Sequence, residues 1–164
     1  MQTLSPRNKG LLTGILMITV LLLFFYGLHK PVIGTTEYIV YAVYIAGILW
    51  SLFDFKKTAA DDAKFKDFFS AGFKTFIVVV LLMAVFTFIF YKFNLQLRDG
   101  PIAENSKLLL QEGNKTVAEI EANAEQLKKI FMPMMVGITT FKYLAIGALI
   151  AAVGAGFLSQ KKEY

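Results

Sequence analysis

Long apolar runs alternate along this chain with short charged segments. Four runs have the length of a membrane-spanning helix, which needs about 20 mostly apolar residues to cross roughly 30 Å of hydrocarbon. They cover residues 10–28, 32–53, 73–91 and 136–158. Charges inside these runs are limited to Glu37, Lys74 and Lys142, each near an end of its run, where a bilayer tolerates them. The pattern predicts an all-α fold, a four-span transmembrane helix bundle.

Between the second and third runs, charged residues are interspersed with aromatic ones. On a helix, Phe65, Phe68, Phe69 and Gly72 share one face, which leaves Lys66 and its charged neighbours toward water or phosphates. We expect a helix at the membrane surface that leads directly into the third run.

Residues 93–133 are the only segment long enough to fold outside the bilayer. Pro101 is suited to the first position of a helix, and Gly113 to the end of it. Thr116 and Glu119 have the spacing of a capping box, which begins a second helix. We therefore predict an extracytoplasmic helical insert, a hairpin, between spans three and four.

The second helix of this insert carries apolar residues three and four positions apart, a seam formed by Val117, Ile120, Ala124, Leu127 and Phe131. Two uses fit such a seam: packing against the first helix of the insert or the membrane surface, and docking of a partner or second copy. Two heptads are too few for a coiled coil. We expect Pro133 to stop or kink this helix.

Basic residues near the ends of the runs predict the orientation, because short loops rich in Lys and Arg stay in the cytoplasm. One side collects nine of the 17 basic residues in short segments: Arg7, Lys9, Lys56, Lys57, Lys64, Lys66, Lys74, Lys161 and Lys162. The other side spreads fewer over a longer segment that also holds six acidic residues, Asp99, Glu104, Glu112, Glu119, Glu121 and Glu125. We therefore expect both termini in the cytoplasm. The net charge of +5 then indicates contact with anionic lipids rather than with nucleic acid.

Composition excludes most common catalytic chemistries. The chain is 56% hydrophobic and 18% charged, with a mean hydropathy of +0.57. It has no Cys and a single His, His29, which removes thiolate sites, histidine clusters and cysteine nucleophiles. No glycine-rich phosphate loop follows a strand, so we expect no cofactor, no metal site and no enzymatic activity.

Two ionisable residues at membrane depth form a candidate intramembrane ion pair. Glu37 lies roughly 8 Å below the outer end of the second span, by the 1.5 Å rise per residue. Lys142 enters the fourth span from the same side. If these spans are neighbours, pairing would lower the cost of holding either charge away from water.

Small residues mark candidate helix-packing faces, because they let helix backbones approach closely in a membrane. Gly10 and Gly14 form such a pair in the first span, and Gly147, Ala151 and Ala155 line one face of the fourth. The pattern leaves open whether these faces meet within one chain or between chains.

The order of these parts resembles the small four-helix membrane proteins of Bacteroidetes grouped as domain of unknown function 4199. The resemblance covers nearly the whole chain and rests on features that are each weak alone: Lys9-Gly10, Phe65-x-x-x-Phe69-x-x-Gly72-Phe73, Gly113-x-x-Thr116-x-x-Glu119-Ile120-Glu121, Pro133, and a Gly- and Ala-rich last span before Lys161-Lys162. The chain departs from the family pattern in one respect. A proline is expected soon after the third span, whereas Pro101 comes about ten residues later. The resemblance implies a location in the bacterial inner membrane and supplies no activity.

Two hypotheses follow for the function. The first is a non-enzymatic scaffold, accessory subunit or regulator, whose partners are the lipid bilayer and another membrane protein or a second copy. The alternative is a small oligomeric transporter or ion-coupled carrier that uses Glu37 and Lys142. In this chain the residues in the middle of the four spans are mostly apolar. Transporters usually place broken helices or polar groups at that depth.

Overall fold

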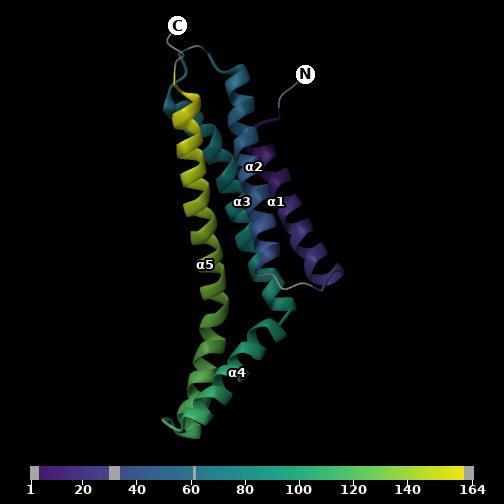
Figure 1. The fold of residues 1–164 in the computed structure, drawn as a ribbon, viewed down its shortest axis with the longest axis vertical. Helices are drawn as coiled ribbons and strands as arrows, with labels where there is room; N and C mark the ends of the chain where they lie inside the picture. Colours follow the sequence, from purple (N-terminus) through teal and green to yellow (C-terminus); the bar gives the residue numbers. More distant parts are fainter. Residues whose placement is uncertain (1–3, 30–33, 61, 161–164) are drawn as a thin grey trace. The chain divides into compact units, whose positions relative to one another are not determined.

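The computed structural model describes residues 4–29, 34–60 and 62–160, and every regular element in these ranges is helical (Figure 1). The elements are α1 (Pro6–Leu22), a π-helical turn η1 (Leu23–Gly27), α2 (Thr35–Thr58), α3 (Phe65–Phe93), α4 (Gln96–Glu112) and α5 (Val117–Leu158). Helix α1 continued by η1, and helices α2, α3 and α5, are each long and apolar enough to cross a membrane. The prediction of an all-helical chain with four such segments is confirmed.

The chain divides into two compact units. The first comprises Met1–Met83 and Thr140–Tyr164 and holds α1, α2, the first part of α3 and the last part of α5. The second is Ala84–Thr139, which holds the end of α3, all of α4 and the start of α5.

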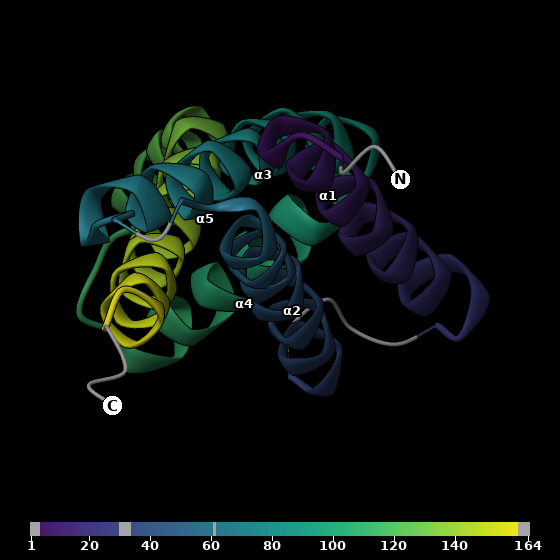
Figure 2. The same ribbon diagram turned by 90° about the horizontal axis from the view of Figure 1, so that it is seen from above.

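In the first unit, α2 contacts the three other helices (Figure 2). Its side chains bond to Lys9 of α1, to Thr75 of α3 and to the backbone of Tyr143 in α5. Its buried apolar residues, Val40, Tyr44, Ile48 and Leu52, fill the centre of this unit. Helix α2 is therefore the element around which the unit is packed.

Helix α1 begins four residues before the expected span. Ser5 is the N-cap, and its hydroxyl accepts a hydrogen bond from the Asn8 N–H at 3.3 Å, while Pro6 occupies the first helical position. Both residue types favour a helix start. As a result Lys9, which the sequence pattern placed ahead of the helix, lies inside it.

The first turns of α3, which carry the aromatic residues, are packed against other helices rather than lying free at a membrane surface as expected. Phe65 begins α3, and its ring stacks on Phe69, but Phe68 is buried and meets Phe55 of α2 edge-on at 5.1 Å between ring centroids. Gly72 packs against Ala151 of α5. This face is thus covered partly by protein, because the bundle reaches to the first turns of α3.

Both prolines of the second unit lie within helices, so Pro101 does not begin a helix and Pro133 does not stop one. Pro133 lies inside α5, which runs through it for 42 residues, and Pro101 lies inside α4. A proline removes one backbone hydrogen bond, and a helix can continue through it where neighbouring groups satisfy the freed carbonyl. Helix α4 starts before the expected position at Pro101 because Asn94 joins it to α3. The side-chain amide of Asn94 donates to the Phe90 carbonyl at 2.8 Å, and the backbone carbonyl of Asn94 accepts from the Leu97 N–H at 3.0 Å.

The second unit folds back on itself at Gly113, which has the left-handed φ of 68° at the end of α4. The capping box that begins α5 is confirmed: the Thr116 N–H donates to the Glu119 carboxylate at 2.8 Å, and the Glu119 N–H donates to the Thr116 hydroxyl at 3.3 Å. Ile102 of α4 and Ile120 of α5 are buried. These residues make a hairpin of α4 and the start of α5.

Charged side chains of α4 and α5 also lie near one another in this hairpin. Arg98 donates to Asp99 at 2.7 Å, and Lys128 of α5 adds a positive charge nearby, so the pKa of the Asp99 carboxyl is lowered. Glu125 of α5 likewise helps to raise the pKa of Arg98, after the larger effect of Asp99 itself. The ion pairs themselves form within each helix, Arg98 with Asp99 in α4 and Lys128 with Glu125 in α5.

Small residues allow the helices of the first unit to approach closely. A Cβ atom on Gly10 would lie 2.5 Å from the Thr75 carbonyl oxygen of α3, and one on Gly14 would lie 2.6 Å from Leu82 Cδ1. A Cβ on Gly147 of α5 would lie 2.8 Å from Phe76 Cγ, and Ala151 and Ala155 are fully buried. The structure therefore places all five candidate packing residues at contacts or buried positions within one chain.

We predict that Gly10→Ala lowers the free energy of unfolding by about 1–3 kcal/mol, the usual effect of overpacking a close contact, because the backbone of Thr75 cannot move aside. Gly156→Ala is the matched control, since nothing lies within 4 Å of a Cβ there. Equilibrium unfolding in a mixed detergent system measures both variants. Equal free energies of unfolding for Gly10→Ala and Gly156→Ala would contradict the close contact of α1 with α3.

Candidate functional site

Helix α2 carries an ion pair near each of its ends. At the carboxyl end, the Lys9 ammonium of α1 binds the Asp54 carboxylate, and these side chains are only 3% and 16% exposed. Lys9 Nζ also lies 5.6 Å from the centroid of the Trp50 ring, which Asp54 follows by four residues. Lys9 is thus held by one anion and one aromatic face, a combination that stabilises a cation removed from water.

At the amino end of α2, the structure brings together the predicted pair Glu37 and Lys142. The Lys142 ammonium of α5 binds Glu37 Oε1, which also accepts a hydrogen bond from the Tyr41 hydroxyl at 2.8 Å. Lys142 Nζ lies 5.5 Å from the Tyr41 ring centroid. The side chains of Glu37 and Lys142 are 28% and 44% exposed, so this pair is more accessible than the one at Lys9. Seventeen residues separate Glu37 from Asp54 along α2, about 25 Å at 1.5 Å per residue.

Polar groups between the two pairs are bonded within the bundle. The Tyr44 hydroxyl donates to the backbone carbonyl of Tyr143 at 2.8 Å. The hydroxyls of Ser51 and Thr75 lie 2.7 Å apart, and Thr75 also donates to the Pro6 carbonyl at 3.0 Å. These bonds tie α2 to α5, α3 and α1, and they satisfy groups that would be costly to bury alone.

Apolar side chains fill the space between these polar contacts. Ile48 and Val79 are fully buried, and Phe76 is nearly so. Phe76 and Tyr44 both lie against Gly147, where there is no room for a side chain. The interior between the two ion pairs is therefore packed.

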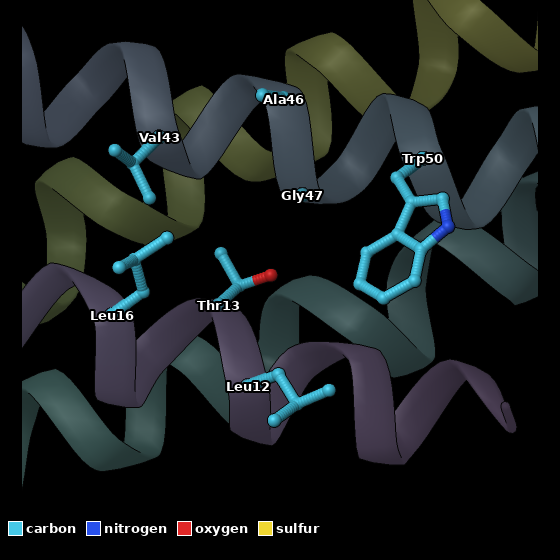
Figure 3. Close-up of a pocket in the computed structure, with 7 residues that line it drawn as sticks. All are labelled: Leu12, Thr13, Leu16, Val43, Ala46, Gly47 and Trp50. Atoms are coloured by element: carbon cyan, nitrogen blue, oxygen red, sulfur yellow. The ribbon is translucent and has the colours of Figure 1, made fainter.

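Two apolar grooves lie on the outside of the first unit. One, of about 330 Å³, runs between α1 and α2 and is shown in Figure 3. Its lining is Leu12, Thr13, Leu16, Val43, Ala46, Gly47 and Trp50. The other, of about 220 Å³, lies between α2 and α5 and is lined by Ile45, Leu49, Phe53, Ile150, Val153, Gly154, Phe157 and Leu158.

Sequence reasoning missed the Lys9–Asp54 pair because the expected spans begin just after Lys9 and end just before Asp54. The missed signal was Ser5-Pro6, a cap followed by a proline, which moves the start of α1 ahead of Lys9. A second signal is the spacing of Trp50 and Asp54, since residues four apart share a helix face.

The predicted seam of the second unit lies partly inside the hairpin. Ile120 is 4% exposed, and Phe131 meets Tyr91 edge-on at 5.3 Å between ring centroids. Ala124 and Leu127 are half-buried, whereas Val117 is 62% exposed. Most of the seam thus packs against the chain's own residues.

No group of three His, Asp or Glu side chains that could hold a metal ion occurs within residues 4–29, 34–60 and 62–160. Asp61, one of the acidic residues next to α3, and Lys161 and Lys162, which contribute to the expected orientation, lie outside the described residues.

Comparison with known proteins places the chain in one family. Residues 8–160 match the family model described as "Protein of unknown function (DUF4199)". The chain belongs to the DUF4199 family. No curated protein and no solved structure matches it. The DUF4199 match covers the four helices suited to crossing a membrane except the first two residues of α1, and both ion pairs of α2 lie within it.

We predict that Asp54→Asn lowers the free energy of unfolding by about 3–5 kcal/mol, the usual cost of leaving one partner of a buried pair unpaired. The exposed Asp62 supplies the control, Asp62→Asn, which should unfold like the parent protein. Equilibrium unfolding followed by circular dichroism measures the difference. Equal unfolding free energies for Asp54→Asn and Asp62→Asn would show that the burial of Lys9 does not depend on Asp54.

Proposed function

We propose that this protein is a non-enzymatic component of the bacterial inner membrane. It acts as a scaffold, accessory subunit or regulator through protein–protein contacts. Both termini lie in the cytoplasm, and the hairpin of α4 and the start of α5 lies on the opposite side. Four helices suited to crossing a membrane support the location, and the density of Lys and Arg supports the orientation.

The observation that carries this proposal is a set of exposed apolar side chains near the turn of the hairpin. Leu108, Leu110 and Val117, which we call the hairpin-tip residues, are each more than half exposed. They adjoin charged residues such as Lys107, Glu112 and Lys115, and α4 is not among the helices apolar enough to cross a membrane. Residues two apart on a helix point to different sides, so Leu108 and Leu110 offer separate apolar contacts rather than one patch. Exposed apolar side chains of this kind can supply contact area to a partner protein.

The hairpin is also built to hold these residues in place. Gly113 fixes the turn, and the capping box of Thr116 and Glu119 fixes the first turn of α5. The buried residues Ile102 and Ile120 then pack within the hairpin. The partner-binding role predicted for the seam is thus better assigned to its exposed end at Val117 and to the neighbouring leucines of α4.

The transporter alternative uses Glu37 and Lys142, which the structure pairs within reach of solvent. Toward the other ion pair, however, the bundle is filled by Tyr44, Ile48 and Phe76. This packing supports a structural role for the Glu37–Lys142 pair, since a carrier needs an accessible site near the midplane.

We predict that the double variant Leu110→Glu/Val117→Glu remains folded but loses its partner subunit or its own oligomeric state. Burying two carboxylates in an interface without partners is unfavourable, whereas both positions tolerate charge in the free chain. Native mass spectrometry of protein extracted in nanodiscs, without harsh delipidation, reports copy number and partners together.

Lys107→Glu/Lys115→Glu is the matched control, because it changes charge near the same turn and leaves the apolar side chains in place. Loss of assembly in the apolar variant alone is the expected result. Assembly that survives in both variants, or a parent protein that is already a bare monomer, would contradict the proposal. Flux into proteoliposomes that is abolished by Glu37→Gln would instead support the carrier.

A further inference from the structure

The groove between α1 and α2 has a chemically distinct end. Figure 3 shows the Trp50 indole standing across one end, while Leu12 and Leu16 of α1 and Val43 of α2 line its length. Trp50 is 44% exposed and is the single tryptophan of the chain. The groove is thus apolar along its length and closed by an aromatic ring with one polar N–H.

The lining suits a hydrocarbon chain. Thr13 is the one hydroxyl residue among the seven that line the groove, and it is buried against Gly47, which leaves no room for a side chain there. All seven lie in helices long and apolar enough to cross a membrane, so in a bilayer the groove would border acyl chains. The volume of about 330 Å³ lies within the roughly 300–1,000 Å³ range of ligand pockets.

The Trp50 end of the groove is basic. Lys57 lies seven residues beyond Trp50 on α2, hence on the same helix face, and it is exposed. No carboxylate among the described residues pairs with Lys57, because Asp54 is taken by the buried Lys9. Trp50 itself is well suited to a membrane interface, with its ring in the apolar layer and its N–H toward head groups.

We propose that this groove binds an anionic phospholipid. One acyl chain lies along Leu12, Leu16 and Val43, and the phosphate head group is held by the Lys57 ammonium and the Trp50 indole N–H. The Lys9–Asp54 pair is a positioning element: Lys9 lies against the Trp50 ring, and Asp54 keeps Lys9 in place, which leaves Lys57 to meet the head group.

The second groove, between α2 and α5, provides the contrast within the same unit. Its lining, from Ile45 to Leu158, is entirely apolar and has no indole. Lys56 lies seven residues beyond Leu49 and follows that face of α2, but no indole N–H accompanies it, so we assign the preference for an anionic lipid to the Trp50 groove, where a basic residue and an indole occur together.

The single tryptophan makes this proposal directly measurable. The protein is reconstituted in phosphatidylcholine vesicles that contain an equal, small fraction of either phosphatidylglycerol or phosphatidylcholine with brominated acyl chains, which quench indole fluorescence on contact. We expect brominated phosphatidylglycerol to associate about fivefold more strongly, the preference that one basic side chain near a membrane surface provides. Lys57→Gln should remove the preference, whereas Lys56→Gln, on a different face, should retain it.

A second pair of variants tests the acyl-chain site. Ala46→Leu narrows the groove and should reduce quenching by phosphatidylglycerol, while Ala42→Leu, exposed on α2 outside the lining, should not. Equal quenching by the two lipids would overturn the proposal, as would an equal loss of preference in the Lys56 and Lys57 variants. Weak quenching by both lipids that increases when the protein is diluted in lipid would assign the groove to a second copy instead.

Discussion

A charge inside an apolar helix bundle must be paired, and in this protein the pairing of Lys9 with Asp54 fixes how α1 meets α2. Lys9 is almost fully buried, so its ammonium depends on the Asp54 carboxylate and the Trp50 ring for the stabilisation that water would otherwise give. Close packing of α1 against its neighbours then follows from Gly10, Gly14 and Gly47, where side chains would not fit. The ion pair thus sets the register in which these small residues act.

Helix α2 is also joined to the other helices of the first unit by polar side chains. Its polar side chains are bonded to α1 through Asp54, to α3 through Ser51, and to α5 through Tyr44 and Glu37. Because membrane helices gain little from apolar burial against one another, such bonds and close contacts determine which helices are neighbours. The outward face of α2 carries exposed residues such as Trp50 and borders both grooves. The helix that organises the bundle therefore also lines its two apolar grooves.

Much of the fold could be predicted from the sequence, because length and hydropathy alone identify helices suited to crossing a membrane. The capping box at Thr116 was predictable for a similar reason, since its partners lie three residues apart. Features that depend on distant residues were harder. A proline usually interrupts a helix, so the continuation of α5 through Pro133 could not be expected, and the burial of Ile120 depends on residues distant in sequence. The partner of Lys9 is 45 residues away, and the signals that point to it are the Ser5-Pro6 helix start and the spacing of Trp50 and Asp54.

Lys9 and Asp54 act as one unit in holding α1 against α2, and a double-mutant cycle tests this coupling directly. Unfolding free energies are compared for the parent, Lys9→Met, Asp54→Leu and the double variant in one lipid system. Removing both charges together leaves no unpaired ion, and apolar replacements for buried pairs are often neutral or stabilising. We therefore predict that each single variant is strongly destabilised and that the double variant recovers most of the lost free energy of unfolding. Additive effects of the two substitutions on the free energy of unfolding would contradict this prediction.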